Sequence, residues 1–536
     1  MSINEEKFLW WKHGVIYHIF PHSFNDTDGD GAGDIEGIIQ KLDYLSDLGV
    51  DAIWLSPVYE SPWIDAGYDI SDYKSINSIY GDMNAFKRLL DMAHKKNIRI
   101  IMDLVLNHTS DRHKWFQESR SSKNSPKREW YIWRSPSKKG KRPNNWQTNY
   151  WQSAWTFDAL TGEYYYHSFF KEQPDLNWRN PELENEMFET VRFWLDTGVD
   201  GFRLDVINMI FKDENLRNNP ITHFFSDRHV YNRNQPELYD FLKKFRALLD
   251  KYPDKVSVGE IYTLPPGNPK LTASFMGDGK NMLHLTFDFS LIFSRWNASK
   301  YRKIINNFYQ AIPNGGHPCF VMSNHDLGRS VKRWIFAFNR YEKAKIHAIL
   351  LLTLKGTPFI YYGDEIGMEN VIIPKNRIRD MYGKLFFPFY RGRDRSRTPM
   401  QWNDLINAGF SAVEPWLPVH RNYRTVNVAS ESADSNSILN LYKNLIRLRK
   451  THKALQSGEI EFTDFAEKGI ISYIRTYEDT KIKVILNFTG KHRKIKSFNL
   501  KYGEILLSTH AQNREISGNT DILNPFEGIL VKLTEN

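Results

Sequence analysis

The stretch Ile98-Arg-Ile-Ile-Met-Asp-Leu-Val-Leu-Asn-His108 is an almost continuous apolar run that ends in polar residues. Such a run is typical of a strand buried on both faces, as in a parallel sheet. Similar runs recur along the chain, with helical apolar spacing between them over residues 35–48 and 84–94. The eight predicted strands are 15–20, 52–57, 98–106, 198–206, 256–261, 282–289, 319–323 and 358–362. Eight strands alternating with helices predict an α/β fold, a (β/α)8 TIM barrel.

Three regions depart from this alternation. Residues 107–175 are rich in Trp, Lys and Asn and predict a loop-rich domain inserted after strand three, and residues 365–420 predict an insertion after strand eight. After a helix at 437–450 the pattern becomes all-β, with strands at 470–476 and 482–487. We therefore predict a barrel of residues 1–106 and 176–456, an inserted domain 107–175, and a C-terminal antiparallel β-sandwich domain 457–536.

Composition excludes several classes of protein. The 536 residues are 41% apolar and 14% aromatic, enough for a large core, so a disordered or collagen-like chain is excluded. The only cysteine, Cys319, lies in an apolar run and cannot form an internal disulfide, which indicates a packed core residue. No run approaches the roughly 20 apolar residues of a membrane span, and no signal peptide is visible. We expect a cytoplasmic protein without a membrane partner.

The net charge of +9 is concentrated in one segment. Residues 120–142 hold nine Lys or Arg against one acid, Glu129, so the remaining chain is close to neutral. Trp130, Tyr131 and Trp133 interleave with these cations, as in a groove for single-stranded nucleic acid. The alternative is a solvated basic loop with its aromatic side chains turned inward, which is how most charge runs are found. We favour the second interpretation and predict no nucleic-acid partner.

Acids stand at the carboxyl ends of four predicted strands. These ends read Asp103 to Asn107-His108, Gly201-Phe-Arg203-Leu-Asp205-Val206, Val258-Gly-Glu260 and Ser323-Asn-His325-Asp326. One such acid is commonly a helix cap or loop anchor. In a TIM barrel, however, these ends meet at the face that carries the active site. Four acids converging there predict a catalytic centre.

These four segments resemble the four signature regions of the α-amylase superfamily, in order and spacing. The resemblance extends over nearly the whole chain and includes Gly67-Tyr-Asp-Ile-Ser-Asp-Tyr73, Gln173-Pro-Asp-Leu-Asn-Trp178 and Arg393-Asp-Arg-Ser-Arg-Thr-Pro-Met-Gln-Trp402. The last two are typical of the oligo-1,6-glucosidase and α-glucosidase branch. The resemblance implies a retaining exo-α-glucosidase that acts on small oligosaccharides, with no organic cofactor.

Retaining cleavage of a glycosidic bond needs a carboxylate nucleophile and an acid that protonates the leaving oxygen. The resemblance implies that Asp205 is the nucleophile and Glu260 the acid and later the base. Arg203, two residues before Asp205 on the same strand, points the same way and is expected to keep it ionised. Asp326 would be the third acid, binding sugar hydroxyls and stabilising the positively charged transition state.

The resemblance also implies a pocket for the terminal glucose. His108 and His325 would bind hydroxyls, although a structural role in the core is the alternative for each. Asp65 would bind the same sugar, although Asp is also common in turns. The remaining predicted pocket residues are Tyr68, which stacks on the sugar, Arg393, which is a partner of the same ring, and Phe169 and Gln173 from the inserted domain.

A glycine-rich loop, Asp26-Thr-Asp28-Gly-Asp30-Gly-Ala32-Gly-Asp34, alternates acids after the first predicted strand. It is similar to the first half of an EF-hand loop but lacks the downstream Glu. In the resembled branch this loop binds a structural calcium ion, which implies Ca²⁺ ligands at Asp26, Asp28, Asp30, the Ala32 carbonyl and Asp34. A magnesium or water-filled loop is the alternative.

Linkage preference depends on the residue after the predicted nucleophile. Val206 resembles the branch members that cut α-1,6 bonds, and its isopropyl group would restrict the leaving sugar. Three departures from the branch pattern leave the linkage preference open. Ile-Tyr-Thr-Leu-Pro-Pro follows Glu260, His22 replaces a frequent Arg, and Gln152 replaces a frequent Gly. The alternatives are an α-1,4-glucosidase, a sucrose hydrolase, or a sucrose or maltose isomerase or glucosyltransferase of the same fold. A catalytically dead binding relative is disfavoured because all three acids are present.

Overall fold

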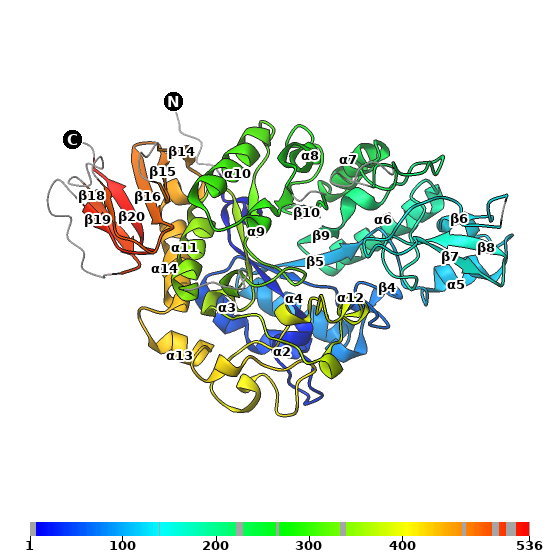
Figure 1. Cartoon of the computed structure of the whole chain (residues 1–536), viewed down its shortest axis with the longest axis horizontal. Coiled ribbons are helices and arrows are strands. Elements are labelled where there is room, and N and C mark those ends of the chain that lie inside the picture. Colours follow the sequence, from blue (N-terminus) through cyan, green and yellow to red (C-terminus); the bar gives the residue numbers. More distant parts are fainter. Residues whose placement is uncertain are drawn as a thin grey trace.

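The computed structural model describes residues 7–534 apart from 139, 221–228, 264–266, 333–338, 464–467, 496–502 and 511–520. Eight parallel strands close into a barrel in chain order, which confirms the predicted fold and all eight predicted strands (Figure 1). They are β1 (Ile16–Ile19), β2 (Ala52–Leu55), β5 (Arg99–Val105), β9 (Gly201–Asp205), β10 (Val256–Glu260), β11 (Leu285–Asp288), β12 (Cys319–Val321) and β13 (Thr357–Tyr361).

The register of the strands positions the predicted site. Arg203 on β9 lies beside Asp103 on β5 and beside Val258 on β10, two residues before Glu260. Because alternate side chains along a strand share a face, Asp103, Arg203, Asp205 and Glu260 come together without any help from loops. Cys319 is fully buried in β12, as its apolar neighbours predict.

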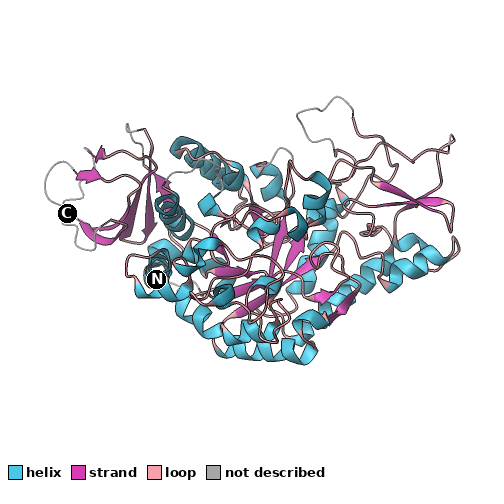
Figure 2. Ribbon diagram, turned by 60° about the horizontal axis from the view of Figure 1, so that its bottom comes forward, coloured by secondary structure: helices cyan, strands magenta, loops and turns pink. Residues whose placement is uncertain are grey.

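Helices surround the strands on the outside (Figure 2). Those between or after the barrel strands include α2 (Ile35–Gln40), α3 (Leu42–Leu48), α4 (Met83–Lys95), α6 (Pro181–Thr197), α7 (Glu237–Leu249), α8 (Pro269–Ser274), α10 (Ala298–Ala311), α11 (Arg340–Thr353) and α14 (Ile438–Thr451). Their starts follow capping rules: the Asp82 side chain accepts from Ala85 N at α4, and Asn180 from Leu183 N at α6. The helical pattern over 35–48 is divided at Lys41 into α2 and α3. None of the described helices is long and apolar enough to cross a membrane.

The segment between β5 and α6 builds its own small sheet. It contains α5 (Lys114–Ser121), the 3-10 turn η3 (Arg128–Trp130) and the strands β6 (Trp133–Arg134), β7 (Trp155–Asp158) and β8 (Glu163–Tyr166), paired antiparallel in the order β6-β8-β7. An antiparallel bridge between His108 and Asp175 joins the two ends of the segment. In Figure 1 this sheet projects away from the barrel, on the side opposite the C-terminal strands.

Four of the eight described cations in the basic run of 120–142 pair with acids of this segment, namely Arg120, Lys123, Lys127 and Arg128. Trp130, Tyr131 and Trp133 are buried, with exposures of 5% or less, so their rings are not available for stacking on bases. The Arg128 guanidinium lies 3.5 Å from the centre of the Trp133 ring. Arg120 Nε lies 2.7 Å from Asp158 Oδ1. Lys139, which belongs to the same run, lies outside the described residues.

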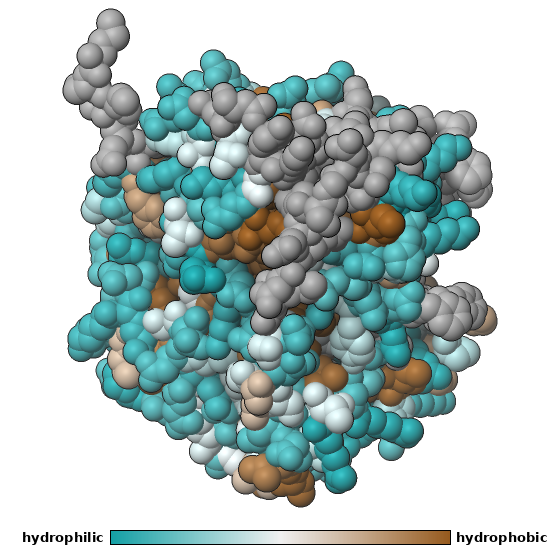
Figure 3. All heavy atoms as spheres, turned by 90° about the vertical axis from the view of Figure 1, so that its left-hand side faces the viewer, coloured by the Kyte–Doolittle hydropathy of each residue, from teal (hydrophilic) through white to brown (hydrophobic). Residues whose placement is uncertain are grey.

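The C-terminal part is strand-rich, as the sequence predicts. A five-stranded antiparallel sheet contains β14 (Glu459–Phe462), β15 (Ile470–Tyr477), β16 (Thr480–Asn487), β20 (Gly528–Leu533) and β18 (Gly503–Ser508), and a two-stranded sheet pairs β17 (Arg493–Ile495) with β19 (Asp521–Leu523). The sheet joins the barrel through buried polar contacts, such as Tyr473 Oη to Thr353 Oγ1 at 2.6 Å. The face at this end is mostly hydrophilic, with small separate apolar patches (Figure 3).

Candidate active site

A cavity of about 190 Å³ opens at the carboxyl ends of the barrel strands, where the sequence predicts the active site. Three strand-end acids reach it: Asp205, Glu260 and Asp326. The other lining residues are Asp65, Tyr68, His108, Asn149, Tyr150, Phe169, Val206, Tyr262, Leu327, Tyr382, Tyr390 and Arg393. The structure therefore brings the predicted catalytic residues and most predicted pocket residues into one cavity.

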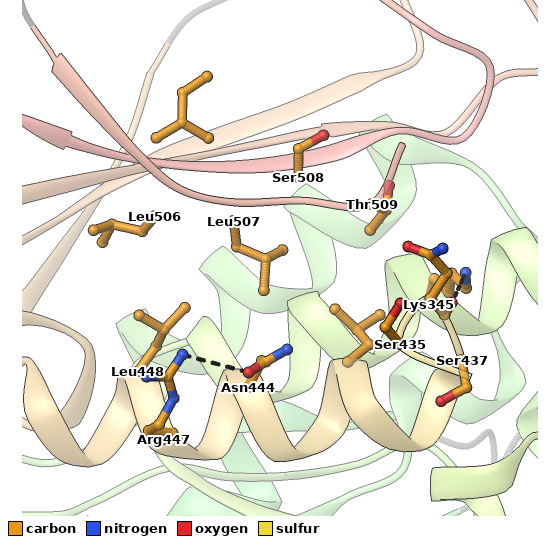
Figure 4. Close-up of a pocket in the computed structure, with 13 residues that line it drawn as sticks. Lys345, Ser435, Ser437, Asn444, Arg447, Leu448, Leu506, Leu507, Ser508 and Thr509 are labelled. Carbon is orange, nitrogen blue, oxygen red and sulfur yellow. Dashed lines mark hydrogen bonds between the residues drawn. The ribbon is translucent and has the colours of Figure 1, made fainter. Parts of the chain in front are cut away.

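A different cavity, of about 270 Å³, lies between α14 and β18 (Figure 4). Among its charged lining residues are Lys345 and Arg447, and Arg447 Nη2 lies 3.4 Å from Asn444 Oδ1. None of its lining residues is Asp, Glu, His or Cys. Because glycoside cleavage needs carboxyl groups, this larger cavity does not fit the chemistry that the sequence predicts.

Arg203 stands at the centre of the predicted catalytic carboxylates. Its Nη1 lies 2.7 Å from both Asp103 Oδ1 and Asp205 Oδ1, and its Nη2 lies 2.6 Å from Glu260 Oε2. The Glu260 carboxylate also accepts a hydrogen bond from the Val206 backbone N–H at 3.2 Å. One buried guanidinium thus orients both the predicted nucleophile and the predicted acid. Asp103, which also reaches Tyr68, lies near the carboxyl end of β5; the sequence counts it among the strand-end acids but predicts no role for it.

The electrostatics differ from the expectation that Arg203 simply keeps Asp205 ionised. Burial raises the pKa of Asp205 well above its ordinary value, Arg203 opposes this, and the carboxylates of Glu260, Asp103 and Asp326 add to the rise. Burial likewise raises the pKa of Asp103 to about 6 against the opposing Arg203. Three carboxylates around one cation favour retention of a proton within the cluster, which is a requirement of acid-assisted cleavage.

Asp326 lies in a strongly positive environment. Its Oδ1 is 2.7 Å from Arg397 Nη2, 3.4 Å from Arg393 Nη1 and 3.5 Å from His325 Nε2. Burial acts to raise the pKa of Asp326, but His325 and the two arginines hold it well below the usual range. Burial lowers the pKa of His325 to about 3, so its ring is neutral at pH 7. Asp326 is therefore a fixed negative charge beside the predicted nucleophile.

An ion pair forms part of the cavity wall. Asp65 Oδ1 lies 2.5 Å from Arg393 Nη2, which also lies 2.7 Å from Asp380 Oδ1. Asp65 Oδ2 accepts from Gln173 Nε2 at 3.1 Å, and the same Nε2 lies 3.0 Å from His108 Nε2. These contacts fix the positions of Asp65 and Arg393 in the wall.

Aromatic side chains from distant segments complete the wall. Tyr150 of the inserted segment lies 4.6 Å, ring to ring, from Tyr382 on α12 (Met381–Phe386). Phe169 lies 5.2 Å from the His108 ring, while Tyr68 Oη is 2.8 Å from both Asp103 Oδ2 and His325 Nε2. Sequence reasoning predicted Tyr68 and Phe169 but missed further site residues: Asp103, Asn149, Tyr150, Tyr262, Leu327, Asp380, Tyr382, Tyr390 and Arg397. Only Asp103 and Arg397 carried a signal, at a strand end and in the motif at 393–402.

Val206 has an unusual backbone. Its φ of 35° and ψ of 43° lie in the left-handed region, where a β-branched residue is a genuine outlier. Its side chain is 6% exposed and lines the cavity, as predicted. The strained turn directs the Val206 N–H toward Glu260. Strain of this kind persists where the surrounding structure requires it, commonly at functional sites.

The predicted calcium loop brings three of its acids together. Ligand atoms of Asp26, Asp28 and Asp34 lie within 4.8 Å of one another. Asp34 also caps α2 by accepting from Gly37 N at 2.6 Å, and Asp26 accepts from Gly29 N at 2.8 Å. Asp30 is outside this group and accepts from Ala32 N at 2.7 Å. Carboxylate oxygens of this kind suit a hard divalent cation.

Residues 18–458 match a family described as the alpha amylase catalytic domain. An oligo-1,6-glucosidase of Parageobacillus thermoglucosidasius is 41% identical to this chain, over 98% of this chain and 99% of the relative. Among solved structures, an alpha-glucosyl transfer enzyme, XgtA, superposes with a TM-score of 0.91 at 36% identity, covering 98% of this chain and all of that one. The trehalulose synthase MutB of Pseudomonas mesoacidophila MX-45 gives 0.90 at 34% identity, over 98% and 99%.

Proposed function

Because the chain belongs to the alpha-amylase family, we propose that it is a retaining exo-acting α-glucosidase. It removes the terminal non-reducing glucose from short α-glucosides, preferentially α-1,6-linked ones such as isomaltose. The observation that carries this proposal is the guanidinium of Arg203, which contacts Asp205 and Glu260 together at the base of a carboxylate-lined pocket.

In the first step Asp205 attacks the anomeric carbon while Glu260 donates its proton to the leaving oxygen, so the aglycone departs as an alcohol. In the second step Glu260 takes a proton from water, which attacks the same carbon and releases Asp205. Asp326, held ionised by Arg393 and Arg397, stabilises the positive charge that develops on the sugar ring.

Exo action requires that the pocket end beyond the terminal glucose, and we assign that end to the wall made by Asp65 and Arg393. The Asp65–Arg393 ion pair and the contact of Gln173 with Asp65 occupy the space that a further sugar residue would need beyond the terminal glucose. Val206 at the wall supports a preference for the α-1,6 linkage, and the similarity to an oligo-1,6-glucosidase agrees with it. The substrate is therefore a small oligosaccharide.

Transfer of the glucosyl unit is the second candidate activity. It is favoured by the similarity to an alpha-glucosyl transfer enzyme and to a trehalulose synthase, both over nearly the whole chain. The chemistry changes only in the second step, where a sugar hydroxyl replaces water. We also propose that the protein binds calcium at Asp26, Asp28 and Asp34, with Asp30 and the Ala32 carbonyl as further ligands. A cytoplasmic location is part of the same proposal, in keeping with the single buried thiol of Cys319.

The test is to incubate the protein separately with isomaltose, maltose, sucrose and trehalose and to separate the products. Proton NMR during the first minutes identifies the anomer of the released glucose. The proposal predicts α-glucose, released fastest from isomaltose. Release of β-glucose would contradict retention, and a new disaccharide as the main product would favour transfer or isomerisation.

A further inference from the structure

A second cavity, of about 370 Å³, adjoins the catalytic one. Asp65 lines both cavities, so it forms part of the wall between them. By the same measure the catalytic cavity has about 190 Å³. Because that smaller space is proposed to hold a glucosyl unit, the second cavity is large enough for a complete hexose.

Three aromatic rings surround this second cavity. The His22 ring lies 4.0 Å from the Trp63 ring and 4.6 Å from the Trp416 ring, and the two indoles lie 6.0 Å apart. His22 is the residue at which the sequence departs from a frequent Arg, and the mechanism does not use it. Aromatic faces of this kind pack against apolar ring faces of a ligand.

Two buried polar atoms in this cavity wall have no hydrogen-bond partner, namely His22 Nδ1 and Trp63 Nε1. His22 is only 5% exposed, and burial together with Arg379 lowers its pKa to about 3, so the ring is neutral. An unsatisfied buried polar group costs about 1–3 kcal/mol, so a molecule toward which these two side chains can turn would be stabilised by satisfying them.

The charges that line this cavity balance. Its carboxylates are Asp65, Asp380 and Asp394, and its cations are Arg379, Lys384 and Arg397. An ionic ligand would upset this balance, whereas a neutral molecule with many hydroxyl groups can both donate to carboxylates and accept from N–H groups.

The loop that carries Trp63 is held in a strained form. Trp63 has a φ of 65°, and its N–H donates to Ser61 Oγ at 3.1 Å. The buried Asp69 carboxylate accepts from Ile64 N and Asp65 N, both at 2.9 Å. This arrangement keeps the indole of Trp63 and the carboxylate of Asp65 on the wall of the same cavity.

We infer that this cavity is a second binding site for a neutral hexose, and specifically for D-glucose. The inference rests on the proposed function in one respect, since glucose is then the product released next to it. The sugar ring packs against the partly exposed rings of Trp63 and Trp416, and a small rotation of His22 and Trp63 lets its hydroxyl groups satisfy His22 Nδ1 and Trp63 Nε1. The shared Asp65 wall couples occupation of this site to the catalytic pocket.

The test counts glucose molecules per chain by equilibrium dialysis with radiolabelled D-glucose. The catalytic pocket is first blocked with a cyclitol epoxide, which alkylates a nucleophilic carboxylate, and peptide mass spectrometry identifies the labelled residue. We expect a label on Asp205 and one remaining glucose per chain. The absence of any remaining saturable glucose binding overturns the second site.

A substitution and its matched control locate the remaining site. His22→Arg places a longer, charged side chain in the cavity and should reduce the remaining binding from one glucose to none. His510→Arg makes the same change at an exposed position and should leave one. If His22→Arg does not fold, Trp63→Ala replaces it, with a loss of at least tenfold in affinity expected. Unchanged binding in a folded His22→Arg or Trp63→Ala variant overturns the assignment.

The outcomes separate the two proposals. If the epoxide does not label Asp205, the proposed nucleophile is wrong. The second site is then tested by comparing glucose binding in His22→Arg with that in His510→Arg. A correct label with no further glucose counts against the second site alone.

Discussion

Arg203 Nη1 lies 2.7 Å from Asp205 Oδ1, and the second amino group of the same guanidinium contacts Glu260. The proposed nucleophile and the proposed acid therefore share one buried cation. A change in the charge of either carboxylate alters the electrostatic environment of the other, as expected for coupled groups. The predictions for the two residues follow from this arrangement.

Asp205→Asn should abolish turnover and leave the fold intact. The amide keeps nearly the same volume but cannot form the glucosyl-enzyme, so kcat should fall by roughly 10⁴-fold or more. The measurement is kcat on isomaltose, with circular dichroism as the control for folding. A variant that retains a tenth of the wild-type activity contradicts the assignment.

Glu260→Gln should affect substrates unequally. An activated leaving group, such as p-nitrophenol, needs little protonation, so the first step on p-nitrophenyl α-glucoside should be spared relative to isomaltose. Pre-steady-state release of nitrophenol measures that step directly. Equal losses on both substrates would argue against Glu260 as the acid.

Val206→Ala should raise the activity on maltose relative to isomaltose. The change removes part of the wall beside the leaving sugar, and discrimination by such contacts is worth about 1–3 kcal/mol, or roughly tenfold to more than a hundredfold. Val206→Thr nearly preserves the shape and adds a hydroxyl group, and it should shift the preference in the same direction. A wild-type protein that already prefers maltose or sucrose would show that Val206 is not the determinant.

Removal of calcium should lower the melting temperature without a direct effect on chemistry. An ion bound only to the folded state stabilises it by mass action, about 2.7 kcal/mol at a hundredfold excess over its Kd. EDTA should therefore lower the Tm, and calcium should restore it. Asp28→Asn should lose this response, whereas Asp43→Asn, at an exposed carboxylate on α3, should keep it. An unchanged Tm in EDTA, with no metal found by elemental analysis, would refute the site.

Glu365→Gln should change how stability depends on pH. The Glu365 carboxylate is fully buried and accepts from Tyr17 Oη at 2.6 Å and Tyr44 Oη at 2.7 Å, and burial raises its pKa from 4.5 to about 7. The folded state then holds a proton that the unfolded state releases, so stability is lost as pH rises from about 4.5 to 7. The loss is about 3 kcal/mol, from a difference of 7 − 4.5 = 2.5 pKa units.

The variant cannot titrate at this position and should lack this loss. The difference in Tm, wild type minus variant, should therefore decrease as the pH is raised from 4.5 to 8. The changed side chain itself adds only a constant offset to this difference. Parallel Tm curves over this range would contradict the raised pKa of Glu365.

The sequence alone predicted the barrel and the acids that line its candidate site. Each barrel strand is a short local pattern of apolar residues, and Asp205, Glu260 and Asp326 stand at or just after strand ends that the fold brings to one face. Local patterns also indicated the helix of 35–48, although its division at Lys41 carried no signal that the spacing of apolar residues could reveal.

Only the tertiary structure decided which charged groups pair with one another and which side chains line the same cavity. Asp65 reaches Arg393, and Tyr382 meets Tyr150, across long stretches of chain whose relative placement depends on packing rather than on local pattern. The pKa of Asp205 is raised because burial and neighbouring carboxylates outweigh Arg203, which no spacing along the chain reports. The cavity beside His22 likewise exists only because Trp63 and Trp416 fold around a side chain nearly 400 residues from one of them.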